Sequence, residues 1–237
     1  MRQNRTFQEM REISFETNVN LHAEGSCLVK FGNTHVLCTA SVNEKVPHWL
    51  KNSGKGWITA EYGMLPRSTN TRMDREATKG KQGGRTQEIQ RLIGRSLRSI
   101  VSLESLGERQ IKIDCDVIQA DGGTRTASIS GGFVALYQAI NQIKKNYNIS
   151  KPIIKDFLAA VSVGVVNEKA NLDLDYQEDA DAQVDANFVI CESGKIVEIQ
   201  VTGEEYFFSK DQYTELFELA QKGTLEIINA QKKILLS

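Results

Sequence analysis

A glycine-rich turn at residues 121–126, which reads DGGTRT, most constrains what this chain can fold into. An alternating run of apolar and polar residues precedes it at 111–118, and apolar residues at helical spacing follow it from Phe133 to Ile143. The turn therefore joins a strand to a helix. Glycines let a ligand approach the backbone, a helix start attracts anions, and Arg125 adds a fork that fits phosphate oxygens. An anion site and a plain helix cap both explain these six residues.

The charges of the chain are unevenly distributed, although the formal net charge is only −1. Residues 67–98 hold nine Lys or Arg against three Asp or Glu, whereas residues 168–205 hold two Lys against eleven Asp or Glu. Such a division favours a polyanionic partner on one side and a cation on the other, and two solvated faces are the simpler alternative.

The composition is that of a globular protein, with 40% hydrophobic and 25% charged residues. The four cysteines form no close pair, so we expect buried free thiols in a reducing compartment. The start of the chain is polar, and no apolar run reaches the roughly 20 residues that a membrane span needs. We therefore expect a cytoplasmic protein that does not enter a membrane.

Hydrophobic periodicity predicts an α+β fold, because strands precede helices twice along the chain. The patterns predict strands at 13–17, 27–31, 34–40, 57–62, 111–118, 157–166, 184–191 and 196–202, with a further alternation at 171–176. They predict helices at 86–103, from the DGGTRT turn to about 147, from a capping box at Ser209 and Gln212 to Gly223, and at 224–234. We expect one domain, 1–237, with two similar halves.

Three sets of residues suggest chemistry. The first is an anion set: Arg85, at the front of the helix at 86–103, with Gly123, Thr124 and Arg125 at the next helix. These could clamp one phosphate if the two helix starts converge, and the alternative for Arg85 is a plain surface residue.

The second set is acidic and runs from Asp173 through Asp179 to Asp185. Carboxylates this dense repel one another unless a cation or arginines lie among them. Oxygen ligands suit Mg²⁺ or Mn²⁺, and a solvated acidic turn is the alternative.

The third set is the basic segment with Arg67, Arg72, Arg75, Lys79 and Lys81. It suits a nucleic-acid backbone, and a disordered basic loop is the alternative. No histidine lies near any set to activate a water, but a bound phosphate that is itself the nucleophile needs none.

Five phrases of the chain are shared with a known family. They are GKGW at 54–57, AEYGMLP at 60–66, GRTQEIQRLIGR at 84–95, DCDV at 114–117 and ADGGTRT at 120–126. Together they closely resemble the bacterial ribonuclease PH family, over residues 23–231.

The resemblance implies a fold like the second domain of ribosomal protein S5, with two β-α-β-type halves. It implies a phosphate-dependent tRNA nucleotidyltransferase, a 3′→5′ exoribonuclease that trims tRNA precursors and other structured RNA, including rRNA, but not DNA. Inorganic phosphate would be the nucleophile, with Mg²⁺ or Mn²⁺ as cofactor, and nucleoside diphosphates would be released reversibly. The family forms a homohexamer, a trimer of dimers. A non-catalytic RNA-binding ring subunit is the alternative.

The family's functional residues fall on named positions here. The family's phosphate-binding positions fall on Arg85, Gly123, Thr124 and Arg125. Its catalytic, metal-associated aspartates fall on Asp179 and Asp185. Its tRNA-binding arginines fall on Arg67, Arg72 and Arg75. Two phrases depart from the family. Residues 3–5 read Gln-Asn-Arg in place of Asp-Gly-Arg, and residues 201–204 read Val-Thr-Gly-Glu in place of Gly-Thr-Ala-Glu. Val201 cannot take the backbone angles of glycine, so local geometry or activity would change if that turn packs under the metal site. The phosphate and metal phrases are intact, and we still expect an active enzyme.

Overall fold

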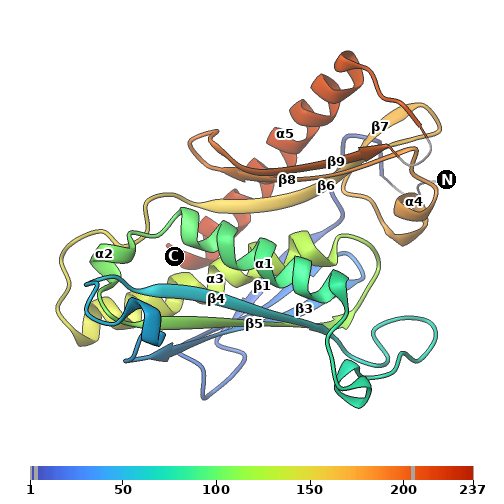
Figure 1. The fold of residues 1–237 in the computed structure, drawn as a ribbon. Coiled ribbons are helices and arrows are strands. Elements are labelled where there is room, and N and C mark those ends of the chain that lie inside the picture. The colour runs from blue at the N-terminus through green and yellow to red at the C-terminus, as the bar shows by residue number, and fades with distance from the viewer. Residues whose placement is uncertain (1, 3–4, 204–205, 237) are drawn as a thin grey trace.

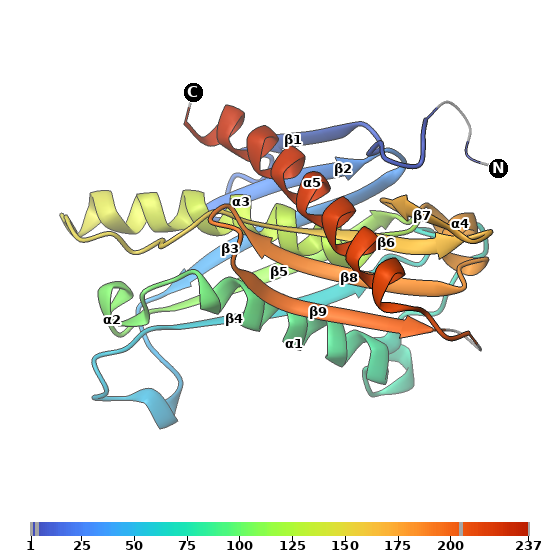
Figure 2. The ribbon, with the colours of Figure 1, turned by 90° about the horizontal axis from the view of Figure 1, so that it is seen from above.

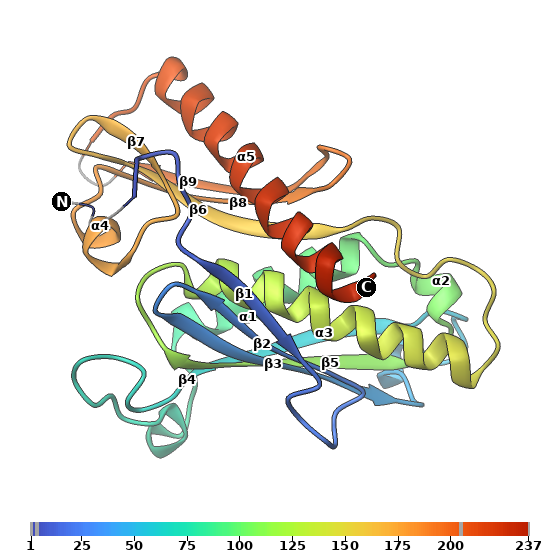
Figure 3. The same cartoon turned by 180° about the vertical axis from the view of Figure 1, so that it is seen from behind.

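The computed structural model describes residues 2, 5–203 and 206–236, and it arranges them in four layers. A five-stranded sheet, a layer with α1 (Gly84–Ser99) and α3 (Thr124–Asn146), a four-stranded sheet and α5 (Lys210–Leu235) follow one another (Figures 1 and 3). Figure 2 shows α5 running diagonally across the four-stranded sheet. The predicted α+β fold is confirmed, since each half contributes one sheet and the helices that pack on it.

The first sheet carries β5 (Gln110–Gln119), the strand that leads into the DGGTRT turn, next to its middle. Its order is β1 (Ile13–Thr17), β2 (Gly25–Phe31), β3 (Thr34–Asn43), β5 and β4 (Trp57–Met64). Neighbours are antiparallel except β4 and β5, which run parallel. Because β5 leads directly into the DGGTRT turn, the sheet fixes where α3 begins.

The second sheet is antiparallel throughout. Its order is β7 (Lys169–Leu172), β6 (Leu158–Val166), β8 (Val184–Cys191) and β9 (Ile196–Gly203). Two tight hairpins join predicted strands: Gly32 and Gly194 take positive φ angles of 52° and 79° between their paired strands. The short helices are η1 (His48–Leu50), η2 (Glu76–Lys79), α2 (Leu103–Leu106) and α4 (Tyr176–Ala180).

Helix α3 is buried along most of its length because it lies between the two sheets. Strands β2 and β3 contact it from one side and β6 from the other. The four cysteines are free and buried as predicted, and three of them, Cys27, Cys38 and Cys115, lie opposite one another across β2, β3 and β5. None of the helices in the described ranges is long and apolar enough to span a bilayer.

Two helix boundaries differ from prediction. Helix α1 ends at Ser99, not at 103, because residues 100–102 leave it to pair with 153–155: Lys155 N donates to Ile100 O at 2.8 Å and Ser102 N to Ile153 O at 2.7 Å. A separate helix, α2, then begins at Leu103 and ends at Leu106, just before Gly107, whose φ is 67°.

The predicted break at Gly223 is wrong, because α5 continues through it to Leu235. Gly223 is a packing residue: a Cβ there would lie 2.7 Å from Leu172 Cδ1 and 3.1 Å from Met10 Sδ. The absence of a side chain at Gly223 lets α5 pack closely against β7.

Because α3 lies between two sheets, we expect two adjacent glycines in it to differ in how well they tolerate substitution by alanine. A Cβ on Gly131 would lie 2.9 Å from Cys38 Sγ and also contact Val29, whereas one on Gly132 would lie 3.3 Å from Ile113 Cγ2. We expect Gly131→Ala to destabilise the protein by about 1–3 kcal/mol through overpacking. Gly132→Ala is the matched control, because the helix propensity that alanine gains, about 1 kcal/mol, offsets its milder contact. Urea unfolding measures both, and equal midpoints would contradict the packing described.

Candidate active site

A cavity of about 320 Å³ takes its lining from both halves of the chain. Helix α1 contributes Arg85, and the turn and α3 contribute Gly122, Gly123, Thr124 and Arg125. The second half contributes Ser162, Tyr176, Asp179, Asp185 and Asn187, and Met64, Thr69 and Ala120 complete the wall. The structure therefore brings the anion set and the two family aspartates to one place, as the clamp hypothesis requires.

The DGGTRT turn is shaped by contact with the second half. Gly122 and Gly123 have φ angles of 74° and 64°, in the left-handed region that favours glycine. A Cβ on Gly122 would lie 2.5 Å from Leu174 O and 2.6 Å from the carbonyl carbon of Asp175. Glycine is thus required by both the backbone angle and the close approach of residues 174–175.

Hydrogen bonds from two other segments hold this turn in place. The buried Thr34 hydroxyl accepts from Asp121 N at 3.0 Å and donates to Gly122 O at 2.6 Å. The Asp121 carboxylate accepts from Tyr176 N at 3.3 Å and from Asn33 Nδ2 at 3.2 Å. The turn is therefore tied to the β2–β3 hairpin and to the first residue of α4.

Thr124 and Arg125 are oriented by residues that sequence reasoning passed over. The hydroxyls of Thr124 and Tyr62 are 2.9 Å apart and hydrogen-bonded, and burial raises the pKa of Tyr62, so this phenol stays neutral. Arg125 Nη1 donates to Gln200 Oε1 at 3.1 Å and pairs with Glu88 Oε1 at 3.5 Å. Glu88 lies inside the shared GRTQEIQRLIGR phrase, which is the signal that could have pointed to it.

Part of the acidic set is paired with arginines near the start of the chain. Asp173 is 1% exposed and pairs with Arg11 at 2.8 Å and with Arg5 at 3.4 Å. Burial opposes ionisation of Asp173, but these arginines outweigh it and lower its pKa. Glu178 pairs with Arg2 at 2.5 Å and with Arg5 at 2.8 Å. The solvated acidic turn is therefore wrong for these residues, and the more than 160 positions that separate the partners hide the pairing from sequence reasoning.

Asp175 of the acidic set has a local role. Its side chain accepts from Glu178 N at 2.9 Å while Glu178 Oε2 accepts from Asp175 N at 3.1 Å, which is a capping box for α4. The alternation at 171–176 is accordingly strand only as far as Leu172, since Asp173 turns the chain with a φ of 56°.

Asp179 and Asp185 line the cavity together with the two arginines. Desolvation raises the pKa of Asp179, and the positive charges of Arg125 and Arg85 offset only part of this rise. Within the described residues, no group of three or more His, Cys, Asp or Glu side chains is arranged to hold a metal. Two carboxylates with the Asn187 amide still form an oxygen donor set that fits Mg²⁺, which binds through one or two carboxylates, water and substrate phosphates.

The basic segment borders a larger cavity of about 990 Å³ beside this site. Its lining includes Arg75, Lys79 and Lys81, and it shares Met64 and Arg85 with the smaller cavity. Arg67 and Arg72 are exposed and do not line it, and Arg72 pairs with Asp74 at 3.1 Å.

The segment from 65 to 83 is anchored to α1 at its far end. Glu76 Oε1 accepts from Gly83 N at 3.0 Å and from the Thr86 hydroxyl at 2.8 Å. The structure thus places the basic segment at the edge of the site, next to Arg85.

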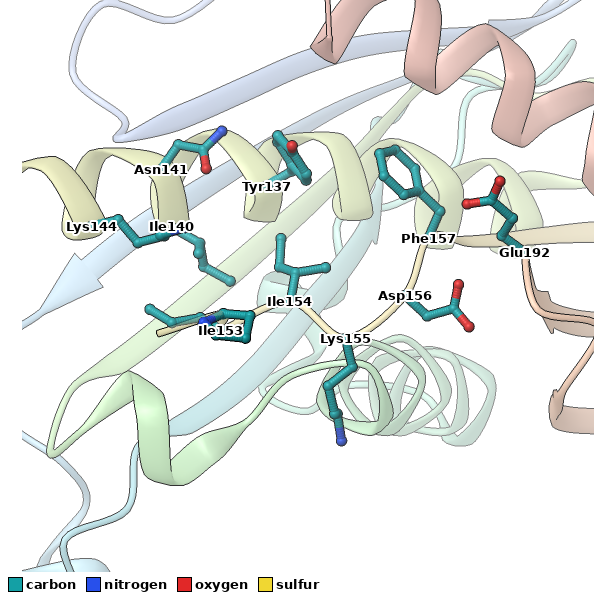
Figure 4. Close-up of a pocket in the computed structure, with 11 residues that line it drawn as sticks. Tyr137, Ile140, Asn141, Lys144, Ile153, Ile154, Lys155, Asp156, Phe157 and Glu192 are labelled. Carbon is teal, nitrogen blue, oxygen red and sulfur yellow. The ribbon is translucent and has the colours of Figure 1, made fainter. Parts of the chain in front are cut away.

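A third cavity, of about 310 Å³, lies at the other end of α3 (Figure 4). Tyr137 and Ile140 face the chain at 152–157 there, with Asp156 and Glu192 nearby. Its described lining contains no arginine and no glycine, and its two lysines, Lys144 and Lys155, are accompanied by the carboxylates Asp156 and Glu192.

The two departures from the family pattern have different outcomes. Gln3 and Asn4 lie outside the described residues, whereas Arg5 makes the ion pairs given above. Val201 lies within β9 opposite Ala186, so the backbone there needs no glycine angle. The close approach is instead at Gly203, where a Cβ would overlap Tyr206 O.

The fit of Gly122 against residues 174–175 predicts a measurable asymmetry. Gly122→Ala combines left-handed strain of about 1–2 kcal/mol with overlap of backbone atoms, so we expect it to cost clearly more than strain alone. Gly194→Ala is the matched control, because Gly194 has a φ of 79° but nothing within 4 Å of a Cβ. Chemical denaturation compares the two variants, and an equal loss would show that residues 174–175 do not constrain the turn.

Known proteins match this chain along nearly its whole length. The 3′ exoribonuclease family model for domain 1 matches residues 9–140, and that for domain 2 matches residues 156–223. Ribonuclease PH of Mesorhizobium japonicum is 62% identical over 230 residues, 96% of each chain. Ribonuclease PH of Brucella ovis is 58% identical over 229 residues, again 96% of each chain.

Solved structures share the fold at lower identity. Rice (Oryza sativa) Rrp46 has a TM-score of 0.79 and 20% identity, and the match covers 98% of each chain. A subunit of the Archaeoglobus fulgidus exosome with RNA bound to the active site has a TM-score of 0.76 and 21% identity, covering 97% of this chain and 89% of that one. On the strength of the family models and the two bacterial relatives, this chain belongs to the ribonuclease PH branch of the 3′ exoribonuclease family and is a phosphorolytic 3′→5′ exoribonuclease.

Proposed function

We propose that the enzyme holds inorganic phosphate between Arg85 and the turn of Gly123, Thr124 and Arg125, and uses it to trim the 3′ tails of tRNA precursors. The observation that carries the proposal is the single cavity lined by these residues and by Asp179 and Asp185. rRNA and other structured RNA with 3′ tails are substrates of the same chemistry.

The site suits a nucleophile that is already an anion. Its described lining holds no histidine, cysteine or lysine to act as a base, but it holds two arginines that offset the charge of phosphate. At the start of α3, Ala127 N donates to Gly123 O, so the N–H groups before it have no partner within the helix and are suited to an anion.

The bonds made and broken balance without a further reactant. A phosphate oxygen bonds to the phosphorus of the terminal linkage, and the bond from that phosphorus to the 3′ oxygen of the preceding nucleotide breaks. The products are a nucleoside diphosphate and an RNA one residue shorter, whose 3′ oxygen leaves as a hydroxyl with the proton that hydrogen phosphate gives up. A phosphoanhydride bond replaces a phosphodiester bond at little net cost in free energy, so the reaction is reversible.

Asp179 and Asp185 would hold Mg²⁺ or Mn²⁺ in this cavity. When bound, the ion neutralises charge on the reacting phosphates and helps to align them. Asn187 and the Ser162 hydroxyl add neutral oxygens to that wall, and Arg125, held by Gln200 and Glu88, faces the same space.

RNA binding is assigned to Arg67, Arg72 and Arg75. Their exposure and the position of their segment beside the larger cavity support contacts to the RNA backbone, which are independent of sequence and sensitive to salt. We further propose a homohexameric ring, a trimer of dimers, and a cytoplasmic location. The two halves would act as one domain, because the cavity takes residues from both.

A non-catalytic RNA-binding ring subunit is not favoured. Relatives that are 58–62% identical over 96% of the chain are named Ribonuclease PH, and the cavity keeps both arginines and both aspartates.

We expect Arg85→Ala to lower kcat/KM for phosphate by about 10²–10³-fold, because a charge-assisted contact to the nucleophile is lost. The rate of nucleoside diphosphate release from tailed tRNA, measured against phosphate concentration, reports the change. Arg91→Ala is the matched control, since Arg91 is exposed on the same helix and does not line the cavity. A normal phosphate dependence in Arg85→Ala would remove this residue from the clamp.

We expect Asp185→Asn to abolish most turnover, by about 10²-fold or more, and a chelator to do the same to the wild type until Mg²⁺ is added back. Asp181→Asn is the control, because Asp181 is exposed in the same acidic segment and does not line the cavity. Full activity of the wild type in excess chelator would refute the proposed metal.

A further inference from the structure

We propose that Arg11 is a positioning residue that sets how the phosphate-binding turn stands relative to the acidic segment carrying Asp179. The inference rests on the proposed function of the cavity. Arg11 does not line that cavity, so it would act through the residues it holds.

The first group of contacts ties Arg11 to the second half of the chain. Its Nε donates to Asp173 Oδ2 at 2.9 Å and its Nη2 to Asp173 Oδ1 at 2.8 Å, a two-pronged pairing. Its backbone N donates to Asp173 Oδ2 at 2.8 Å, and Nη2 also reaches Leu174 O at 3.3 Å. Side-chain exposures of 9% for Arg11 and 1% for Asp173 keep this pair away from solvent.

The second group of contacts ties the same guanidinium to the phosphate-binding turn. Nη1 donates to Asp121 O and lies 3.5 Å from the Thr34 hydroxyl that also holds the turn. A Cβ on Gly123 would lie 3.2 Å from Arg11 Nη2, so the guanidinium lies directly behind the residue that precedes α3. The Arg11 guanidinium therefore links the phosphate-binding turn to the acidic segment, and both of these segments contribute to the cavity wall.

The shape of arginine explains why this position would affect phosphate. Its planar fork directs fixed donors in different directions at once, whereas the ammonium of lysine is a compact charge on a flexible stem. Lysine could keep the charge beside Asp173 but could not also hold Asp121 O in the same geometry. A small shift of the turn relative to Asp179 would weaken phosphate binding and leave the exposed arginines 67, 72 and 75 unaffected.

Arg5 provides a natural comparison. It touches the same partner, donating to Asp173 O at 2.7 Å and Oδ2 at 3.4 Å, with a side-chain exposure of 11%. Its other described partners are Glu9, Asp175 and Glu178, and it makes no described contact with the turn. Arg5 and Arg11 thus share a carboxylate and differ in whether they reach the phosphate-binding turn.

The test compares Arg11→Lys with Arg5→Lys in the full-length enzyme, using inorganic phosphate and a tailed tRNA as the varied substrates. We expect Arg11→Lys to raise the KM for phosphate by about 10-fold and to leave the KM for tRNA within about two-fold. Arg5→Lys should leave both values within about two-fold. An unchanged KM for phosphate in Arg11→Lys, or equal changes in both variants, would overturn the inference.

A second variant separates positioning from folding. The double change Arg11→Met with Asp173→Asn removes the buried charge from both partners, so it should fold while losing the tie to the turn. It should raise the KM for phosphate as Arg11→Lys does, and a normal value would count against Arg11. Absence of any phosphate-dependent release by the wild type has a different meaning, because it would refute the proposed function itself.

Discussion

The structure depends on the contact between the glycine turn at 121–123 and the backbone at 174–175. A Cβ on Gly122 would lie 2.5 Å from Leu174 O, so the two segments touch with no side chain between them. One segment ends a strand of the first sheet and starts α3, and the other leads to α4 and Asp179. Both segments also contribute to the cavity, which Gly122 and Tyr176 line together.

Charge compensation maintains that contact. The acidic segment would repel itself in isolation, but Arg2, Arg5 and Arg11 from the start of the chain supply the opposite charge to Asp173 and Glu178. Asp173 and Glu178 form ion pairs outside the cavity. Asp179 and Asp185 line it together with Arg85 and Arg125. The acidic residues that pair with Arg2, Arg5 and Arg11 thus form a structural group, distinct from the two aspartates in the cavity.

Sequence reasoning predicts the local elements well because their causes are local. The Gly32 hairpin and the capping box of Ser209 and Gln212 depend on residues a few positions apart, and both form. The end of α1 at Ser99 and the continuity of α5 through Gly223 were missed because distant segments, 153–155 and β7, decide them. The same limit hides Arg11 and Gln200, whose partners lie 162 and 75 positions away.

The most direct test of the account uses phosphate labelled with ¹⁸O or ³²P and a tailed tRNA precursor. The account predicts that the label appears in the terminal, β, phosphate of every released nucleoside diphosphate, because the phosphate held by Arg85 and the turn is the nucleophile. Release of unlabelled nucleoside monophosphates that carry oxygen from water, at a rate independent of phosphate, would contradict it.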